Sequence, residues 1–310
     1  MNSQNIQVAN MQCVIENQKK AESINAAAAF RQAYNVTKLI KAALWGVTLT
    51  LATVQLLAAI IDKSKFDLTT FTIISLCCYV ILGSFGKSQM LEKQTLGCTL
   101  QSLHDYLTLG VGKRPSEFDL PPSKVKRLAD KWFQKKECSK KEELATWWDK
   151  SLSSVSFPQA RLICSCVTFY WEVELRKKYQ LFLTLFLVAS LLIPFLISLY
   201  FKFTAYEILL LAIAPFTPFL SLVLEEWLMN KGCLNTAERI RRNSQDVWCK
   251  LQCKSIDDVA LMHETDSLME SWQTYRLSTL PIFEWLYRLT RRRMEDDMIV
   301  DTISLVEQIK

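Results

Sequence analysis

Histidine and glycine are scarce in this chain, whose 310 residues include two histidines and seven glycines. His104 and His263 lie far apart, and the sequence has no HExxH zinc motif, no GxSxG nucleophile turn and no glycine-rich loop of the Walker type. No group of carboxylates has the spacing of metal ligands. We therefore expect a protein that is not an enzyme and has no catalytic residues, no metal and no cofactor of its own.

Alternation of apolar and polar residues, the pattern of a half-buried strand, is also missing. Residues 2–44 contain neither glycine nor proline, and apolar residues recur through them at helical spacing. Further helices are expected at 87–109, where a Gly-x-Gly turn follows, and from Pro158 onward, with a break at 278–281. The sequence predicts an all-α protein.

Four strongly apolar stretches dominate what the sequence does contain. Each has about 20 residues, the length that an apolar helix needs to cross a hydrocarbon core of about 30 Å. Core helices of soluble proteins are usually shorter and amphipathic, and a secretory signal peptide would not follow a long polar segment. Because short turns join the stretches in pairs, they predict two transmembrane helical hairpins. The stretches are 42–61, 68–86, the region between Lys178 and Lys202, and 205–224.

Basic residues gather on one side of these stretches, in a chain with a net charge of +6. Positive residues near the ends of spans prefer the cytoplasm, so we expect a multi-pass protein whose two termini and middle segment are cytoplasmic. None of the ten cysteines falls in an outer turn, and we expect all of them to be reduced. The flanking residues are Lys38, Lys41, Lys87, Lys93, Arg176, Lys177, Lys178 and Lys231.

This plan divides the chain into five segments, and most residues fall outside the membrane. A tether would need far fewer residues, so we expect the cytosolic part to sense something. The middle and C-terminal segments are predicted to form one helical cytosolic domain. The segments are an N-terminal cytosolic helix at 1–41, hairpin 1 at 42–86, the cytosolic middle segment at 87–179, hairpin 2 at 180–224 and the C-terminal helical segment at 225–310.

A basic turn bracketed by glycines is the first candidate for ligand binding. In the sequence VGKRP, backbone N–H groups lie beside Lys113 and Arg114, a combination that suits a phosphate, although a basic loop at the membrane surface explains it as well. Trp147 and Trp148 have the chemistry to stack on a base or to pack between helices. For Arg161, two interpretations are open: an anion contact or a salt bridge at a helix end.

Four residues in the apolar stretches are candidates for a pore or a gate. Pro194 lies in the third stretch, and Pro215 and Pro218 lie in the fourth. Proline removes a backbone hydrogen bond and kinks a helix, which is common in spans that move and also occurs in static bundles. Glu207, near the outer interface, either lines a pore mouth in an oligomer or reaches the lipid headgroups.

Several motifs occur in order along the chain. They are VGKRP at 111–115, Trp147 followed by PQARLIC at 158–164, WEVELRKKY at 171–179, APFTP at 214–218 and PIFEWLYRLTR at 281–291. Together with the two predicted hairpins, this order resembles the SMODS-associating four-transmembrane effectors. The resemblance covers nearly the whole chain, from about Phe30 to Met298.

The resemblance implies a pore-forming membrane effector of bacterial cyclic-oligonucleotide (CBASS-type) anti-phage defence. Its implied partners are a cyclic di- or trinucleotide made by a CD-NTase enzyme, the lipid bilayer of the inner membrane and further copies of the chain, with no DNA or RNA. In the family, the helix that follows the position of Arg161 carries an amide pair, where this chain has Ser165 and Thr168. Either the nucleotide preference differs here or that part of the site is misassigned.

We therefore hypothesise that binding of a cyclic nucleotide shifts a closed oligomer toward an open pore or a disrupted membrane. The candidate ligand contacts are Lys113, Arg114 and Arg161 for phosphate, and Trp147 or Trp148 for stacking. The main alternative is a membrane scaffold that recruits partners without forming a pore. A transporter is a second alternative, but it would be expected to have charged or unwound midplane positions, and apart from the prolines the apolar stretches have none.

Overall fold

The computed structural model describes residues 13–61, 68–135 and 139–309, without the side chains at a few helical positions. These residues are nearly all helical and include no strand, which agrees with the predicted all-α class. The predicted turn at 62–67 lies outside the described residues. The elements are α2 (Val14–Lys19), α3 (Ala21–Ile61), α4 (Leu68–Leu109), α5 (Pro122–Gln134), α6 (Ser139–Ala145), the 3₁₀ turn η1 (Lys150–Ser154), α7 (Phe157–Tyr200), α8 (Ala205–Glu207), the π-helix η2 (Ile208–Ile213), α9 (Ala214–Gln252), α10 (Asp258–Ser278) and α11 (Glu284–Ile309).

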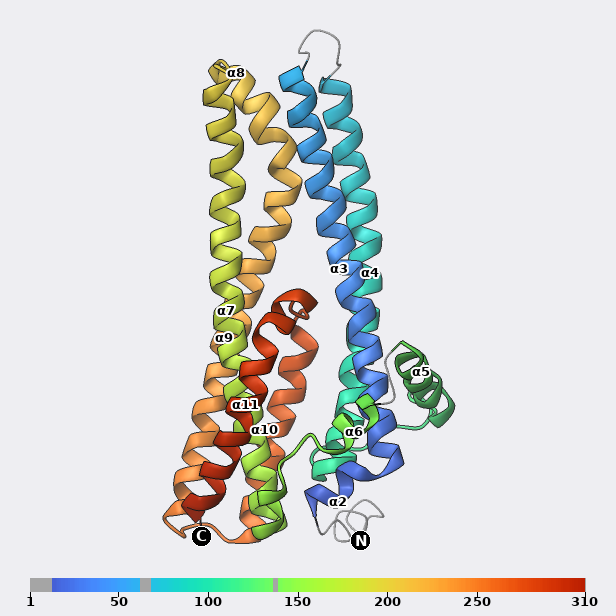
Figure 1. Cartoon of the computed structure of the whole chain (residues 1–310), viewed down its shortest axis with the longest axis vertical. Coiled ribbons are helices and arrows are strands. Elements are labelled where there is room, and N and C mark those ends of the chain that lie inside the picture. Colours follow the sequence, from blue (N-terminus) through green and yellow to red (C-terminus); the bar gives the residue numbers. More distant parts are fainter. Residues whose placement is uncertain (1–12, 62–67, 136–138, 310) are drawn as a thin grey trace. The chain divides into compact units, whose positions relative to one another are not determined.

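The chain forms two compact units, and the long helices α3, α4, α7 and α9 each supply residues to both (Figure 1). Unit 1 comprises Met1–Asn35, Lys93–Arg176 and Cys233–Lys310. Unit 2 comprises Val36–Glu92 and Lys177–Gly232, so it contains the four apolar stretches. Unit 1 holds the predicted middle and C-terminal segments, and the N-terminal segment up to Asn35 joins them.

Two expected helix ends are confirmed. The helix predicted at 87–109 is the second part of α4, which ends at Leu109, immediately before the Gly-x-Gly turn. The break expected at 278–281 separates α10 from α11. Both ends follow from local chemistry, because glycine supplies left-handed backbone and proline cannot continue a helix.

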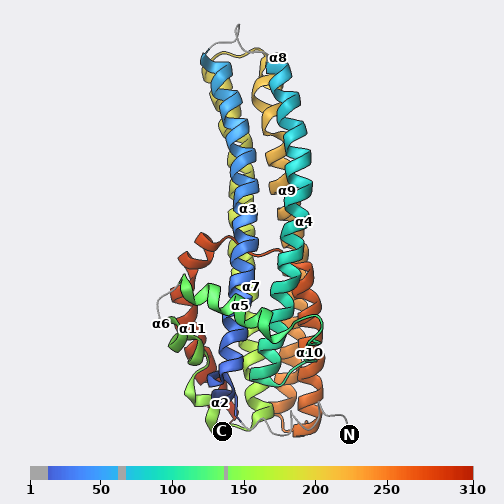
Figure 2. The same cartoon turned by 90° about the vertical axis from the view of Figure 1, so that its right-hand side faces the viewer.

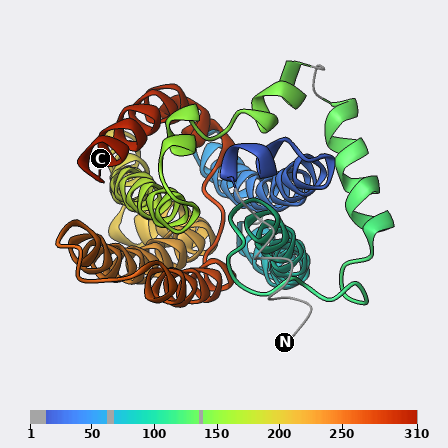
Figure 3. The same cartoon turned by 90° about the horizontal axis from the view of Figure 1, so that it is seen from below.

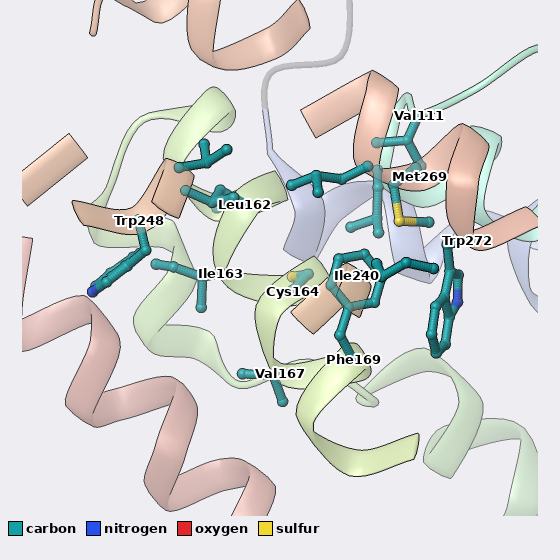
Figure 4. Close-up of a cluster of buried hydrophobic side chains, with 14 of the residues drawn as sticks. Val111, Leu162, Ile163, Cys164, Val167, Phe169, Ile240, Trp248, Met269 and Trp272 are labelled. Carbon is teal, nitrogen blue, oxygen red and sulfur yellow. The ribbon is translucent and has the colours of Figure 1, made fainter. Parts of the chain in front are cut away.

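The largest apolar cluster of unit 1 joins α7, α9, α10 and α11, which Figure 3 shows from one end. Figure 4 shows its centre, where Phe169 of α7, Ile240 of α9 and Trp272 of α10 converge with Val111 from the turn after α4. The Phe169 and Trp272 rings lie 4.7 Å apart between centroids. A single apolar core therefore fixes the turn that carries the predicted phosphate-binding residues.

A second cluster in unit 1 packs α3 against α4. Small residues make this contact close: Ala26, Ala29 and Ala33 on α3 are buried against Leu103 and other residues of α4. Gly97 of α4 faces the ring of Tyr34, and a Cβ at Gly97 would lie 2.8 Å from Tyr34 Cε1. The alanine run in α3 thus serves helix packing in addition to helix propensity.

Unit 2 is built mainly from parts of α3, α4, α7 and α9, which lie side by side in both Figure 1 and Figure 2. Its centre is apolar and aromatic, with Ala52 and Leu56 of α3 packed against Phe216, Phe219 and Val223 of α9. Much of its apolar surface faces outward instead. On α7 the exposed apolar side chains are Leu181, Leu185, Val188, Leu191, Leu192, Ile193, Phe195, Leu196 and Leu199.

Among the residues that the structure describes, two helices are long and apolar enough to span a membrane. They cover Ala21–Ala58, with a mean hydropathy of 1.5 in the span window, and Phe157–Tyr200, with 2.6. In the α7 window only 17% of the residues are buried, whereas an apolar core helix of a soluble protein would be mostly covered. These two helices indicate a membrane protein. Several side chains in 71–82 and 210–212 lie outside the described part of the chain, where the other two spans are expected.

The region before α9 departs from regular α-helix. In η2 the hydrogen-bond ladder is widened by one residue, so that the N–H of Ala214 donates to the carbonyl of Leu209. Pro215 follows directly, and Pro218 lies inside α9. Neither proline has an N–H to donate. Single π-turns of this kind are rare in proteins overall, but those that occur often lie at functional sites. This segment is the one π-helix among the described residues of unit 2.

Candidate functional site

The turn after α4 is built on two glycines in left-handed conformation. Gly110 has a φ of 64° and Gly112 a φ of 73°, which residues with a Cβ adopt only at a cost. The N–H of Gly110 donates to the carbonyl of Tyr106 at 3.0 Å and closes the helix end. A Cβ at Gly112 would lie 2.6 Å from Nε2 of Gln273. The turn therefore approaches α10 more closely than any other residue type would allow.

Arg161 holds this turn from the α7 side. Its side chain is fully buried, and its Nη2 donates to the carbonyl of Gly110 at 3.1 Å and to Oδ1 of Asp266 on α10. The guanidinium carbon lies 5.9 Å from the centroid of the Phe157 ring. The predicted salt bridge at this arginine is present, but its partner lies 105 residues away in the sequence.

Several buried donors near this turn have no hydrogen-bond partner among the described residues. Nε and Nη1 of Arg161 are two of them, and Nε2 of Gln273, which touches Gly112, is a third. An unsatisfied buried donor costs about 1–3 kcal/mol, and more for a charged group. All three are donors, so the chemistry that would satisfy them is an acceptor-rich group such as a phosphate.

Lys113 and Arg114 extend from the same turn toward its surface. Lys113 is exposed. Arg114 is partly buried, and its Nη2 lies 2.8 Å from Oε1 of Glu22 and 3.8 Å from Oε1 of Glu117. The structure thus brings Lys113 and Arg161 to one short loop, while Arg114 is engaged by carboxylates.

The two candidate stacking residues differ in environment. Trp148 is buried in the large cluster of unit 1, and its backbone is bracketed by the Gln18 amide, which donates to the Trp148 carbonyl and accepts from its N–H. Trp147 is partly exposed, with the Arg31 guanidinium 5.2 Å from its ring centroid. Packing accounts for Trp148, and Trp147 has the more accessible ring.

Ser165 and Thr168, which replace the amide pair expected from the resemblance, bond within their own helix. The Ser165 hydroxyl donates to the Arg161 carbonyl at 2.9 Å, and the Thr168 hydroxyl donates to the Cys164 carbonyl at 2.7 Å. Such bonds to the residue four positions earlier are typical of hydroxyl side chains in helices. Neither donor is directed at the turn in this arrangement.

A second basic surface lies on α5, away from the predicted contacts. A depression of about 410 Å³ is lined by Ser123, Lys126, Arg127, Asp130, Lys131 and Gln134. All of its lining residues come from one helix, and none of the predicted ligand contacts belongs to it.

The candidate gating residues lie in unit 2. Pro194 is inside α7, and Pro215 and Pro218 stand at the start and in the interior of α9. Glu207 forms a capping box with Thr204: its Oε2 accepts from the Thr204 N–H at 2.7 Å, while the Glu207 N–H donates to the Thr204 hydroxyl. Glu207 thus has a local role in starting α8, and its place at a pore mouth stays a prediction.

Two further polar networks in unit 1 were not expected from the sequence. Arg276 of α10 pairs with Asp105 of α4, and both are buried. Desolvation raises the pKa of Asp105, but the Arg276 charge and the hydrogen bonds outweigh it, so that the pKa lies below its ordinary value. Arg176 donates to Glu172 and to the carbonyl of Leu280. Arg176 and Glu172 are one turn apart on α7, but no local pattern marks the other partners, because Asp105 and Arg276, like Arg176 and Leu280, are far apart along the chain.

Comparison with known proteins adds one match. The family model of the SMODS-associating 4TM effector domain matches residues 12–305. No curated protein and no solved structure matches the chain. The family match covers both units, including the glycine turn, Arg161 and the apolar stretches. The chain belongs to the SMODS-associating 4TM effector family.

Proposed function

We propose that this protein is a membrane effector of a SMODS-linked defence system, activated by a cyclic di- or trinucleotide that a CD-NTase makes during phage infection. The family membership supports the link to SMODS enzymes and the role as an effector. In this proposal the four apolar stretches form two hairpins across the bacterial inner membrane. Both termini and unit 1 are cytoplasmic, and several copies assemble to form a pore or to disrupt the bilayer.

The buried Arg161 supports the ligand site most directly. It lies in unit 1 behind the glycine turn, with two guanidinium nitrogens that no described residue accepts from. A cyclic oligonucleotide presents phosphate oxygens, which accept charge-assisted hydrogen bonds from guanidinium N–H groups. Lys113 on the same turn would contribute a second charge, and the accessible ring of Trp147 is the better candidate for stacking than the buried Trp148.

The irregular start of α9 is where activation would act on the membrane part. A ligand shifts a conformational equilibrium only if it binds one state more tightly. Two prolines and the widened turn of η2 give this helix fewer regular backbone hydrogen bonds than its neighbours. We infer that this segment changes shape when the pore opens.

The ligand site is tested by titrating the purified full-length protein with a panel of cyclic di- and trinucleotides while following thermal unfolding. We expect one or a few of them to raise the midpoint, since a ligand bound to the folded state stabilises it. Arg161→Lys keeps a positive charge beside Asp266 but removes the guanidinium N–H donors, so it should abolish the rise in the unfolding midpoint. Arg176→Lys is a matched control on the same helix, also buried, and it should keep the shift.

A flat response of the wild type to the whole panel would contradict the sensing proposal. An equal loss of the ligand response in the two variants would show that Arg161 has no specific role. Pore formation is tested separately, by release of a dye from liposomes that contain the protein. A scaffold would bind ligand without leakage, whereas an effector pore would release the dye only when the active nucleotide is added.

A further inference from the structure

We infer that the first turns of α11, together with the end of α10, form a surface that docks on the anionic headgroups of the cytoplasmic leaflet. We call it the anchor surface, and it consists of Leu277, Trp285, Arg288, Leu289 and Arg293. The inference rests on the proposed cytoplasmic placement of unit 1 and is independent of the ligand that activates the protein.

The link between α10 and α11 is fixed where three helices continue into the apolar stretches. Nε2 of Gln94 donates to the carbonyl of Thr279 at 2.8 Å, and Nη2 of Arg176 donates to the carbonyl of Leu280 at 3.1 Å. The thiol of Cys233 lies 4.0 Å from the carbonyl of Ser278. All these contacts are within unit 1, and together they hold the link against α4, α7 and α9.

The holding residues are close in sequence to the predicted membrane boundary. Arg176 precedes the third apolar stretch by about one helical turn, which is roughly 5–6 Å along a helix. Gln94 and Cys233 lie two to three turns beyond the second and fourth stretches. The headgroup region on each side of a bilayer is about 5–8 Å thick. Along the helices these residues lie roughly 5–14 Å from the ends of the apolar stretches, so the link is held near the cytoplasmic headgroups.

The anchor surface presents apolar side chains away from the core of unit 1. On α11 the core face is formed by Leu286, Met294, Met298 and Val306, which are buried. Trp285 and Leu289 occupy the other face, one helical turn apart, with exposed fractions of 51% and 76%. Leu277, at the end of α10, is also exposed. Apolar residues this exposed mark a contact with another surface when they gather beside polar ones.

Charge near the link favours a membrane as that surface. Residues 284–293 include four arginines, at 288 and 291–293, and one acid, Glu284, while the acids Glu295, Asp296 and Asp297 follow one turn farther from the link. Arg288 is well exposed, and it donates to Glu284. Tryptophan with arginine is the combination found where helices lie in a membrane interface, and each basic residue near an anionic leaflet contributes about 1 kcal/mol. A second copy docked symmetrically on this face would instead bring arginines against arginines.

The test measures thiol labelling in the full-length protein reconstituted into vesicles. Leu289→Cys is compared with Val300→Cys, which lies on the same helix, is also strongly exposed and is three turns farther from the link. A membrane-impermeant maleimide is applied, and labelling is quantified for each peptide by mass spectrometry. The native exposed Cys253 serves as the reference for the fraction of molecules that face the reagent.

We expect Leu289→Cys to label several-fold more slowly than Val300→Cys in vesicles with phosphatidylglycerol, and the difference to shrink in pure phosphatidylcholine or at high salt. Equal rates in phosphatidylglycerol would overturn the anchor surface. Protection that is independent of lipid charge and salt would overturn its recognition of headgroups. Protection that disappears when the protein is diluted in the bilayer would point to a second copy instead, and would also overturn it. Labelling of Cys253 by the same reagent from outside intact spheroplasts would contradict the proposed cytoplasmic placement of unit 1, separately from the anchor.

Discussion

In unit 1 three arginines are buried, at 161, 176 and 276, and each pairs with a carboxylate of the same unit. In unit 2 the described buried charges are Lys41 and Glu226, which pair with each other. The other buried residues of unit 2 are apolar or uncharged polar, the latter including Gln55 and Asn230, and most of its described outer surface is apolar. Unit 1 thus combines a polar surface with charges in its core, and unit 2 confines buried charge to one position. The difference fits a soluble sensing part and a part solvated by lipid.

The charged cluster of unit 2 joins three helices at the ends of the apolar stretches that continue into unit 1. Nζ of Lys41 on α3 donates to the Tyr179 hydroxyl of α7 at 2.8 Å and pairs with the Glu226 carboxylate of α9. The Tyr179 hydroxyl also donates to Glu226. A buried ion pair adds little net stability, because desolvation offsets the attraction, and its best-attested use is to fix helix register. Removing one partner of the pair is strongly destabilising, because the other charge is then buried without compensation.

The largest effect is therefore expected from Lys41→Met, which leaves Glu226 buried with the tyrosine alone. Loss of one partner of a buried pair costs about 3–5 kcal/mol, and this should lower the midpoint of unfolding of the full-length protein in detergent. The double variant Lys41→Met with Glu226→Leu should recover most of that loss, since no charge then remains buried. A double variant as unstable as the single one would show that the pair itself stabilises unit 2.

The corresponding pair of unit 1, Asp105 with Arg276, is expected to respond to acid. Because the pKa of Asp105 is lowered in the folded state, its contribution to stability is fully present above the unfolded pKa of about 3.9. It is lost as the pH falls through the folded pKa. Asp105→Asn should cost about 2 kcal/mol at neutral pH, where a charge-assisted bond is lost, and less at low pH.

The measurement is thermal unfolding of both proteins between neutral pH and pH 3. The midpoints of wild type and variant should converge as the pH falls. A difference between wild type and Asp105→Asn that stays constant with pH would contradict the assignment.

These pairs also show which parts of the molecule a sequence can predict. The helix end at Leu109 and the break after Ser278 follow from residues within a turn of each position, so they could be predicted. The candidate residues Lys113 and Arg161 could be proposed because a glycine turn and an isolated arginine are local signals. Asp266 and Gln273 could not, because helix packing alone brings them to the turn. Asp105 and Arg276 are 171 residues apart, and neither has an unusual neighbourhood in the sequence.

The smallest effects, and the sharpest comparison of packing in the two units, come from glycine-to-alanine substitutions in helices. A Cβ at Gly97 would lie 2.8 Å from the Tyr34 ring in unit 1, and a Cβ at Gly86 would lie 2.7 Å from Cδ2 of Leu44 in unit 2. Tyr34 is held by its hydroxyl, which donates to Gln101 at 2.9 Å, whereas the end of a leucine side chain can change rotamer. Alanine also favours the helix over glycine by about 1 kcal/mol.

Gly97→Ala is therefore expected to destabilise the protein by about 1–3 kcal/mol through overpacking, and Gly86→Ala to be close to neutral because the gain in helix propensity offsets the shift of Leu44. Gly232→Ala is the control, since nothing lies within 4 Å of its Cβ position, and it should raise the unfolding midpoint slightly. Ranking the three midpoints checks the expectation. If Gly86→Ala were as harmful as Gly97→Ala, the helices of unit 2 would have to be packed as rigidly as those of unit 1, which would argue against a membrane part that rearranges on activation.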